Sequence, residues 1–252
     1  MLEQTWQCAA RLAGERRVIT VIDEGCRLDA RKAPLSSLIV EQPCGFDTAP
    51  GIFLALSYVM AEDPEATVLT FLPDHFMEPK DLFASYMEEA AGLAERLCDY
   101  VILTAAEAER ARTDHGWIQP GRSAAACGRA SSVLRFHDKH DAAQAEFHRC
   151  GYLWNTLNLA VKGRTLWSMG WKHTPAIMDG FEALRAVIGL SEEADVLRVI
   201  YDYMKPINFS KGLLEKVVDK ALVLPMDDIL WTEGEHYANA LSPAVGAYEE
   251  MA

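Results

Sequence analysis

The segment TVLTFLPDH, from Thr67 to His75, is an apolar run that leads directly into a carboxylate and an imidazole. Its first six residues are β-branched or apolar on both faces, which predicts a central parallel strand buried under helices. Pro73 removes a backbone donor and ends the strand. Ligands of α/β proteins bind at the carboxyl ends of parallel strands. We therefore expect Asp74 at the lip of a crevice, holding a divalent cation against a phosphate; that it only caps the turn is the alternative.

Composition predicts one soluble globular domain over residues 1–252. Half of the residues are hydrophobic and 24% are charged, enough for one sizeable core. The longest apolar stretch, Gly51 to Ala61, is too short to span a bilayer, and the start of the chain does not resemble a signal peptide, so we expect a cytoplasmic protein. The six cysteines are widely spaced without a Cys-x-x-Cys pair, which predicts neither a zinc site nor a disulfide framework.

The net charge of −13 argues against a nucleic-acid-binding protein, because no basic block is available to displace counterions from a phosphate backbone. A small anionic ligand remains compatible with this charge. It requires local cations or a bound metal, so a carboxylate at a strand end becomes a candidate metal ligand.

Apolar strands and amphipathic helices alternate along the first half of the chain. This order predicts an α/β fold with a doubly wound, mainly parallel sheet and helices on both faces. Thr48 and Pro50 have the character of a helix start, with Thr48 as N-cap, and Ser210 is expected to cap a long helix through Lys220. The expected strands cover residues 18–22, 38–40, 67–72, 100–104, 132–136, 157–161 and 221–225. An opening helix is expected to end within residues 11–14. The other expected helices cover residues 48–61, 82–97, 141–149, 176–189 and 192–204.

Seven short motifs follow one another in the sequence. They are Gln42-Pro-x4-Thr48-Ala-Pro, Pro73-Asp-His, His115-Gly-Trp-Ile, Phe136-x-Asp-Lys, Leu153-Trp-Asn-Thr, Asn208-Phe-Ser and Trp231-Thr-Glu-Gly. Each motif alone is weak, but the ordered set resembles the mannose-1-phosphate guanylyltransferase family of sugar-phosphate nucleotidyltransferases, from Leu2 to about Gly234. The resemblance implies a nucleotide-diphospho-sugar transferase fold, Rossmann-like and of the GT-A type.

The resemblance also implies a reaction. In this family the phosphate of a sugar 1-phosphate attacks the α-phosphorus of a nucleoside triphosphate, here GTP with mannose 1-phosphate, and Mg²⁺ and cationic side chains neutralise the charge. The resemblance implies that Asp74 and Glu233 are the metal-binding carboxylates and that Asp74 and Lys139 are the catalytic residues. The residues implied to contact the nucleotide or sugar are Thr48, Ala49, Gly116, Asp138 and Asn155.

Each of these residues also has a purely structural interpretation. Lys139 fits a solvated turn, Gly116 a turn with positive φ, and Asn155 a partner for neighbouring backbone. Trp154 is more typical of a core residue than of a ligand contact, and Glu233 equally fits an exposed surface position.

The chain departs from the family pattern at both ends. The family opens with a first strand and a loop of the type Gly-Gly-x-Gly-x-Arg-Leu, and neither matches residues 1–252, so we expect an N-terminally truncated domain with the first strand missing. The family's Trp-Ser-Asp-x-Gly is Trp231-Thr-Glu-Gly here, and Asp138 and His140 replace the outer residues of Glu-Lys-Pro. Because such a loop holds and neutralises the phosphates, we expect little or no release of pyrophosphate from GTP and mannose 1-phosphate.

Two further functions stay open. One is a non-catalytic protein that binds a nucleotide or sugar phosphate, or partners an active homologue in a homo- or hetero-oligomer. The other, less supported, is a metal-dependent hydrolase built on Asp74 and His75.

Overall fold

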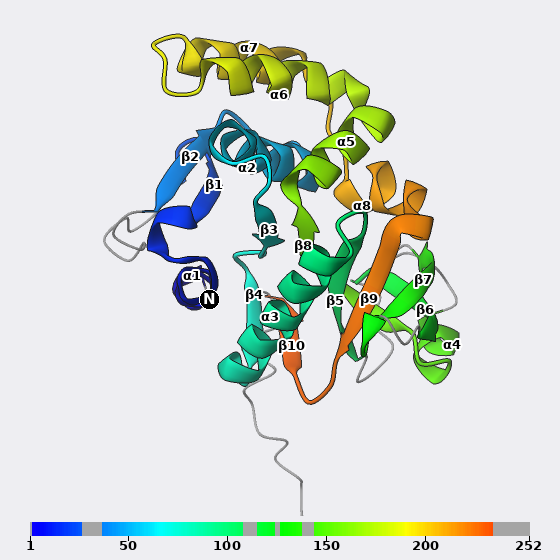
Figure 1. Cartoon of the computed structure of the whole chain (residues 1–252). Helices are drawn as coiled ribbons and strands as arrows, with labels where there is room; N and C mark the ends of the chain where they lie inside the picture. Colours follow the sequence, from blue (N-terminus) through cyan, green and yellow to red (C-terminus); the bar gives the residue numbers. More distant parts are fainter. Residues whose placement is uncertain (1, 27–36, 108–114, 124–126, 138–143, 234–252) are drawn as a thin grey trace, which may run out of the picture.

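The computed structural model describes residues 2–26, 37–107, 115–123, 127–137 and 144–233, which form an α/β fold (Figure 1). The described helices are α1 (Leu2–Ala13), α2 (Thr48–Glu62), α3 (Lys80–Arg96), α4 (Gln144–Arg149), α5 (Gly163–His173), α6 (Pro175–Val187), α7 (Glu193–Tyr203) and α8 (Phe209–Gly212). The described strands are β1 (Ile19–Asp23), β2 (Leu38–Gln42), β3 (Thr67–Thr70), β4 (His75–Glu78), β5 (Val101–Glu107), β6 (Trp117–Ser123), β7 (Ser131–His137), β8 (Leu153–Lys162), β9 (Ala221–Met226) and β10 (Leu230–Glu233).

The main sheet is mixed, which corrects the expected mainly parallel sheet. Its strand order is β3-β8-β5-β9-β7-β6, and within it only β5 and β9 pair in parallel among the described strands. Two smaller sheets accompany it, a parallel pair of β1 and β2 and an antiparallel pair of β4 and β10. The difference has two sources: the long strand β8 runs antiparallel to β3 and β5, and β7 runs antiparallel to β9 and β6.

The position of β3 also differs from the expected central strand. This strand lies at the edge of the six-stranded sheet, with β8 as its one partner among the described strands, and all four of its residues are half-buried. Its two threonines make polar contacts: the Thr70 hydroxyl donates to the Leu157 carbonyl at 3.0 Å, and Thr67 contacts Glu95. The polar atoms of these threonines explain why a run that reads as apolar tolerates an edge position.

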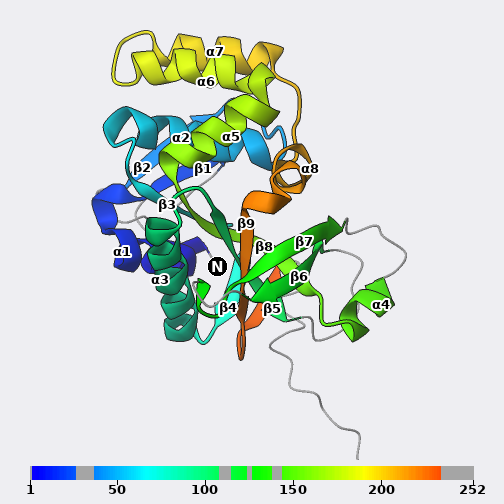
Figure 2. The same ribbon diagram turned by 45° about the vertical axis from the view of Figure 1, so that its right-hand side comes forward.

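Helices cover both faces of the sheet, as expected. On one face α2 and α5 belong to a hydrophobic cluster that contains the alternate strand residues Val101, Leu103 and Ala105, and α6 packs on α2 with α7 on α6. On the other face α3 packs over Ile102 and Ala106. Figures 1 and 2 show α6 and α7 as the outermost layer on their side. None of the described helices is long and apolar enough to cross a lipid bilayer.

Local signals explain most of the remaining differences from the expected elements. The N-cap of α2 is Asp47 rather than Thr48, since the Asp47 carboxylate accepts from the Thr48 amide at 2.7 Å. The expected long helix after Ser210 is instead the single turn α8, capped by Asn208, followed by two short 3-10 turns. The short strands β4 and β10 and the helix α5 were not predicted, and the start of the helix expected at Asp141 lies outside the described residues.

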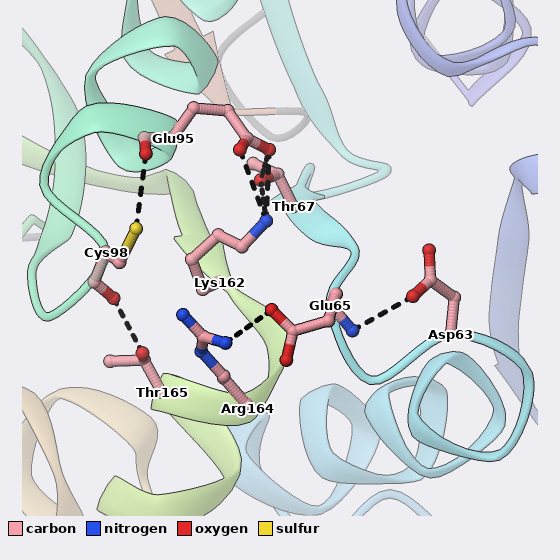
Figure 3. A network of polar contacts seen from close by, with 8 residues as sticks. All are labelled: Asp63, Glu65, Thr67, Glu95, Cys98, Lys162, Arg164 and Thr165. Carbon is pink, nitrogen blue, oxygen red and sulfur yellow. Dashed lines mark hydrogen bonds and ion pairs between the residues drawn. The ribbon is translucent and has the colours of Figure 1, made fainter.

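A buried lysine at the edge of the sheet anchors β8 to α3 and β3 (Figure 3). Lys162, which is 6% exposed, directs its ammonium to Glu95 Oε1 at 3.1 Å and to Thr67 Oγ1 at 3.2 Å. Nearby, the Thr165 hydroxyl donates to the Cys98 carbonyl at 2.6 Å, and Arg164 pairs with Glu65. The contacts of Lys162 satisfy a charge that is otherwise costly to bury.

Candidate functional site

Asp74 lies in an exposed turn at the end of β3. The turn is closed by a hydrogen bond from the His75 amide to the Leu72 carbonyl at 3.4 Å, and β4 begins at His75. The Asp74 side chain is exposed and makes no hydrogen bond or ion pair with any residue in the described part of the chain. The capping interpretation of Asp74 is therefore wrong, and its carboxylate is available to a ligand.

Strand β10 brings Glu233 to the same place. In the antiparallel pair of β10 and β4, Glu233 is the backbone partner of His75. The backbone positions of Glu233 and Asp74 are thus separated by one strand-to-strand step and one residue along the chain, although the two residues are far apart in sequence. The two residues that the resemblance implies as metal ligands are brought together by the backbone of the fold.

The turn before β10 is fixed by a tyrosine that the sequence did not single out. The Tyr86 hydroxyl, on α3, donates to the Asp227 carbonyl at 3.1 Å and accepts from the Asp227 amide at 3.0 Å. Arg129 donates to the same hydroxyl at 3.1 Å and to the Asp227 carboxylate at 2.5 Å. Asp228, next in the turn, has a φ of 57°. Tyr86 and Arg129 therefore fix the start of β10, and through this strand the backbone position of Glu233.

Next to the backbone positions of Asp74 and Glu233, a buried aromatic cluster joins four of the seven motifs. The Trp231 ring lies edge-on to His75 at 5.1 Å and to His115 at 4.5 Å between ring centroids. Trp154 lies 5.2 Å from His115 and 5.8 Å from Trp231. Edge-to-face packing of this kind stabilises a core. Trp154 is a core residue, as its structural interpretation predicts, and each ring belongs to a motif that contains a candidate site residue.

Gly116 and Asn155 lie side by side on the rim of this cluster. The backbone N–H of Asn155 donates to the Gly116 carbonyl at 2.9 Å. The Asn155 side chain accepts from the Leu157 amide at 3.1 Å and donates to Ser210 Oγ at 3.2 Å, so it also supports the neighbouring backbone. Gly116 does not have a positive φ, which makes the expected reason for a glycine there wrong. A role of either residue toward a sugar stays a prediction.

Thr48 and Ala49 form one unit with the Asn208-Phe-Ser motif. The Thr48 hydroxyl accepts from the Phe209 amide at 2.9 Å, and the Ala49 amide donates to the Ile207 carbonyl at 3.1 Å. Ala49 is fully buried, while Thr48 is half-buried. The start of α2 is thereby held against α8, and two motifs that are distant in sequence become adjacent.

Gln42, which opens the first motif, connects the ends of β1 and β2 to α7. Its side-chain amide donates to Asp23 at 2.6 Å, and its oxygen accepts from the Tyr201 hydroxyl at 2.9 Å. Burial raises the pKa of Tyr201, so its hydroxyl stays protonated and remains a donor. Asp23 approaches Gly45 closely, since a Cβ at Gly45 would lie 3.0 Å from the Asp23 carboxylate.

Asp138 and Lys139 lie outside the described residues. The described chain reaches His137 at the end of β7, where His137 is the backbone partner of Trp117, the neighbour of Gly116. The roles of Asp138 and Lys139 toward a phosphate or sugar stay predictions.

The donors present fit Mg²⁺ better than a transition metal. No group of three or more histidine, cysteine, aspartate or glutamate side chains capable of holding a metal occurs within the described ranges. Asp74 and Glu233 are two carboxylate residues at neighbouring backbone positions. Mg²⁺ is commonly held by one or two protein carboxylates, with waters and substrate phosphates completing the octahedron. The residue types present therefore fit Mg²⁺, and that Asp74 and Glu233 bind it stays a prediction.

The fold and the position of these residues define an α/β protein with a mixed sheet and acidic residues at one rim. Two solved structures share this fold over 92% of the chain. They are mannose-1-phosphate geranyltransferase from Thermus thermophilus, with a TM-score of 0.80, 24% identity and 65% of that chain covered, and mannose-6-phosphate isomerase from Helicobacter pylori, with a TM-score of 0.74, 16% identity and 90% covered. At these identities the likeness establishes the fold alone.

The chain is also similar in sequence to curated proteins. Xanthan biosynthesis protein XanB of Xanthomonas campestris pv. campestris is 26% identical over 90% of this chain and 49% of its own length. Mannose-1-phosphate guanylyltransferase of Escherichia coli K12 is 27% identical over 77% of this chain and 41% of its own length. No protein-family model matches the chain. These relatives confirm the resemblance to mannose-1-phosphate guanylyltransferases, and the chain spans about half the length of the curated relatives it matches.

Proposed function

We propose that this chain binds a nucleotide sugar, or the nucleoside triphosphate and sugar 1-phosphate from which it is made, at the rim formed by Asp74, Gly116, Asn155 and Glu233. The observation that carries the proposal is the pairing of Glu233 with His75, which brings the backbone of Glu233 beside Asp74, an exposed residue whose side chain has no partner among the described residues. GTP and mannose 1-phosphate are the proposed substrates and GDP-mannose the proposed product, by analogy with the named relatives.

Asp74 and Glu233 would hold Mg²⁺ in this complex. The ion would neutralise phosphate charge that the acidic chain, with its net charge of −13, otherwise repels. The rim residues would position the sugar, and the aromatic cluster next to them would keep the rim rigid. The proposed fold type is that of the nucleotide-diphospho-sugar transferases.

We further propose that residues 1–252 alone catalyse the reaction of GTP with mannose 1-phosphate only slowly. No stretch of this sequence has the family's glycine-rich pattern Gly-Gly-x-Gly-x-Arg, whose backbone amides would stabilise the triphosphate. Binding and turnover are therefore expected to separate: the chain binds GDP-mannose with Mg²⁺ but releases little pyrophosphate.

Two measurements test this function. Isothermal calorimetry with GDP-mannose should show binding that disappears when Mg²⁺ is removed by EDTA. A coupled assay with GTP, mannose 1-phosphate and Mg²⁺ should show pyrophosphate release near the background rate. Absence of Mg²⁺-dependent binding would overturn the proposed site, and robust turnover abolished by Asp74→Ala would overturn the proposed low activity.

A further inference from the structure

A cavity of about 210 Å³ is lined by residues of α1, of α3 and of the segment just beyond β3. The two helices pack against each other (Figures 1 and 2). Gln4 and Cys8 of α1, Phe83 of α3, and Phe71 and Leu72 after β3 are among the lining residues. The cavity has room for roughly seven water molecules of about 30 Å³ each, which is enough space for a small ring compound.

A buried amide without a partner lines this cavity. Asn158, on β8, is 1% exposed, and its Nδ2 has no hydrogen-bond partner among the described residues. Its backbone is already bonded, because its N–H donates to Thr156 Oγ1 and its carbonyl accepts from Thr104 Oγ1, both at 3.3 Å. Ala160, two residues further along β8, belongs to the cluster under α3, so the Asn158 side chain points to the same face of the sheet. A ligand that brings an acceptor into the cavity therefore removes the penalty of a buried, unbonded donor.

The walls of the cavity favour an apolar ligand. Met77 and Phe83 are buried, and Phe71 is half-buried. Burial raises the pKa of the Cys8 thiol to about 11, so this wall residue stays neutral at physiological pH. These side chains offer apolar contact area and few hydrogen bonds to a ligand, which suits a hydrophobic ring.

The charged residues Arg11, Lys80 and Asp81 also line the cavity, but all three are exposed to water. Arg11 pairs with Asp81. A charged ligand gains little from exposed ions, because water and salt screen them. The net charge of −13 further disfavours an anion. The surroundings of the cavity therefore favour a neutral ligand.

The cavity is separate from the proposed nucleotide site. None of the four rim residues of that site lines it. Leu72 and His75, which stand on either side of the turn that carries Asp74, do line it. The cavity thus lies next to the Asp74 turn without sharing the rim.

We propose that this cavity binds a neutral small molecule that has an apolar ring and a carbonyl group. The ring packs against Phe83 and Met77, and the carbonyl oxygen accepts a hydrogen bond from Asn158 Nδ2. This binding does not depend on the proposed nucleotide site, and it requires neither Mg²⁺ nor a nucleotide.

A matched pair of probes tests the proposal on the full chain. Acetophenone and α-methylstyrene have nearly the same shape, but the carbonyl oxygen of the first is a methylene group in the second. Their affinities for the unchanged chain and for Asn158→Leu are measured by titration followed in ¹H–¹⁵N NMR spectra. Comparison of the two chains cancels the different hydration of the two probes. We expect the relative preference for acetophenone to fall by about fivefold or more in Asn158→Leu, because the leucine has the size of asparagine but no donor.

A second variant tests the location without changing Asn158. Thr5→Phe adds a ring to a residue that lines the cavity and should abolish binding of both probes. Glu3→Phe, in the same helix but not among the lining residues, is its control and should bind both probes like the unchanged chain. The proposal is overturned if neither probe binds, if the preference changes by less than about twofold in Asn158→Leu, or if Thr5→Phe binds both probes as tightly as Glu3→Phe.

Discussion

Glu233 is the backbone partner of His75 in the antiparallel pair of β10 and β4, and this pairing places its backbone next to Asp74. Two separate sets of contacts hold the backbones of Glu233 and Asp74 near each other. The rings of Trp231 and His75 pack edge-on within the same strand pair, and the turn that precedes β10 is bound to α3 by Tyr86. Because both supports are buried or partly buried, the neighbouring positions of the two acidic residues are a fixed feature of the fold.

Asp74→Asn should weaken Mg²⁺-dependent binding of GDP-mannose by about tenfold or more, which is about 1.4 kcal/mol. The amide keeps the size of the side chain but loses the charge that attracts the cation. Glu78→Gln, at the exposed far end of the adjacent strand β4, is the matched control and should bind like the unchanged chain. Calorimetric titrations of GDP-mannose with and without Mg²⁺ measure the effect. Equal affinity for both variants would show that Asp74 holds no metal.

Tyr86→Phe should destabilise the chain by about 1–2 kcal/mol, because it leaves the Asp227 amide and carbonyl without their hydroxyl partner. Tyr203→Phe is the control, since Tyr203 is 84% exposed and should change the free energy of unfolding by less than about 0.5 kcal/mol. Urea unfolding measures both. Tyr86→Phe should also weaken Mg²⁺-dependent nucleotide-sugar binding, because β10 loses its anchor. Unchanged unfolding and binding would mean that Tyr86 does not position β10.

Sequence patterns predicted the elements that have strong local signals. The periodicity of Leu82 to Leu97 predicted α3, and the apolar runs at Tyr100 and Ala221 predicted β5 and β9. The direction of the strands was not accessible in this way, because an apolar run such as Thr67 to Leu72 suits a parallel or an antiparallel neighbour equally well. The edge position of β3 is set by β8, whose residues lie far along the chain from it.

The candidate site was also predictable from the sequence only in part. The resemblance implied that Gly116 and Asn155 line one pocket and that Asp74 and Glu233 hold one metal; their backbones lie close together in the fold, while these roles stay predictions. It gave no signal for Tyr86 or Arg129, which act from outside the motifs through contacts with Asp227. Four-residue strands such as β4 and β10 are too short for a period-two pattern to be distinguished, and their pairing appears only in the fold.

Glu95→Gln should destabilise the chain more than Lys162→Met does. The glutamine leaves the buried Lys162 ammonium without its counter-charge, at a cost of about 1–2 kcal/mol. The methionine keeps the aliphatic stem and leaves only Glu95, whose side chain is 57% exposed and returns to water, so its cost should be within about 1 kcal/mol. Urea unfolding of the two variants at neutral pH measures the difference. The reverse order would contradict the role assigned to Lys162.

The same pair gives a pH dependence. The hydrogen bond from Thr67, and then that from Lys162, lowers the pKa of Glu95 below its ordinary value of 4.5. A carboxyl whose folded pKa is lowered contributes stability above its unfolded pKa and loses that contribution as the pH falls through the folded pKa. The difference in unfolding free energy between the unchanged chain and Glu95→Gln should be constant from neutral pH to about pH 5 and shrink below 4.5. A difference that does not change on acidification would contradict the assignment.

Two glycines in helices should respond in opposite directions to alanine. A Cβ at Gly170, in α5, would lie 2.6 Å from Phe53 Cε1 and 2.7 Å from Met178 Sδ, and both of these side chains are fully buried. Gly170→Ala should therefore cost about 1–3 kcal/mol through overpacking. At Gly92, in α3, the nearest atom is the flexible end of Arg96 at 3.6 Å. Gly92→Ala should stabilise the chain by about 0.5–1 kcal/mol, because it restricts the unfolded backbone without a clash. Urea midpoints that move in the same direction for both variants would show that α5 does not pack on α2 and α6 as closely as these distances require.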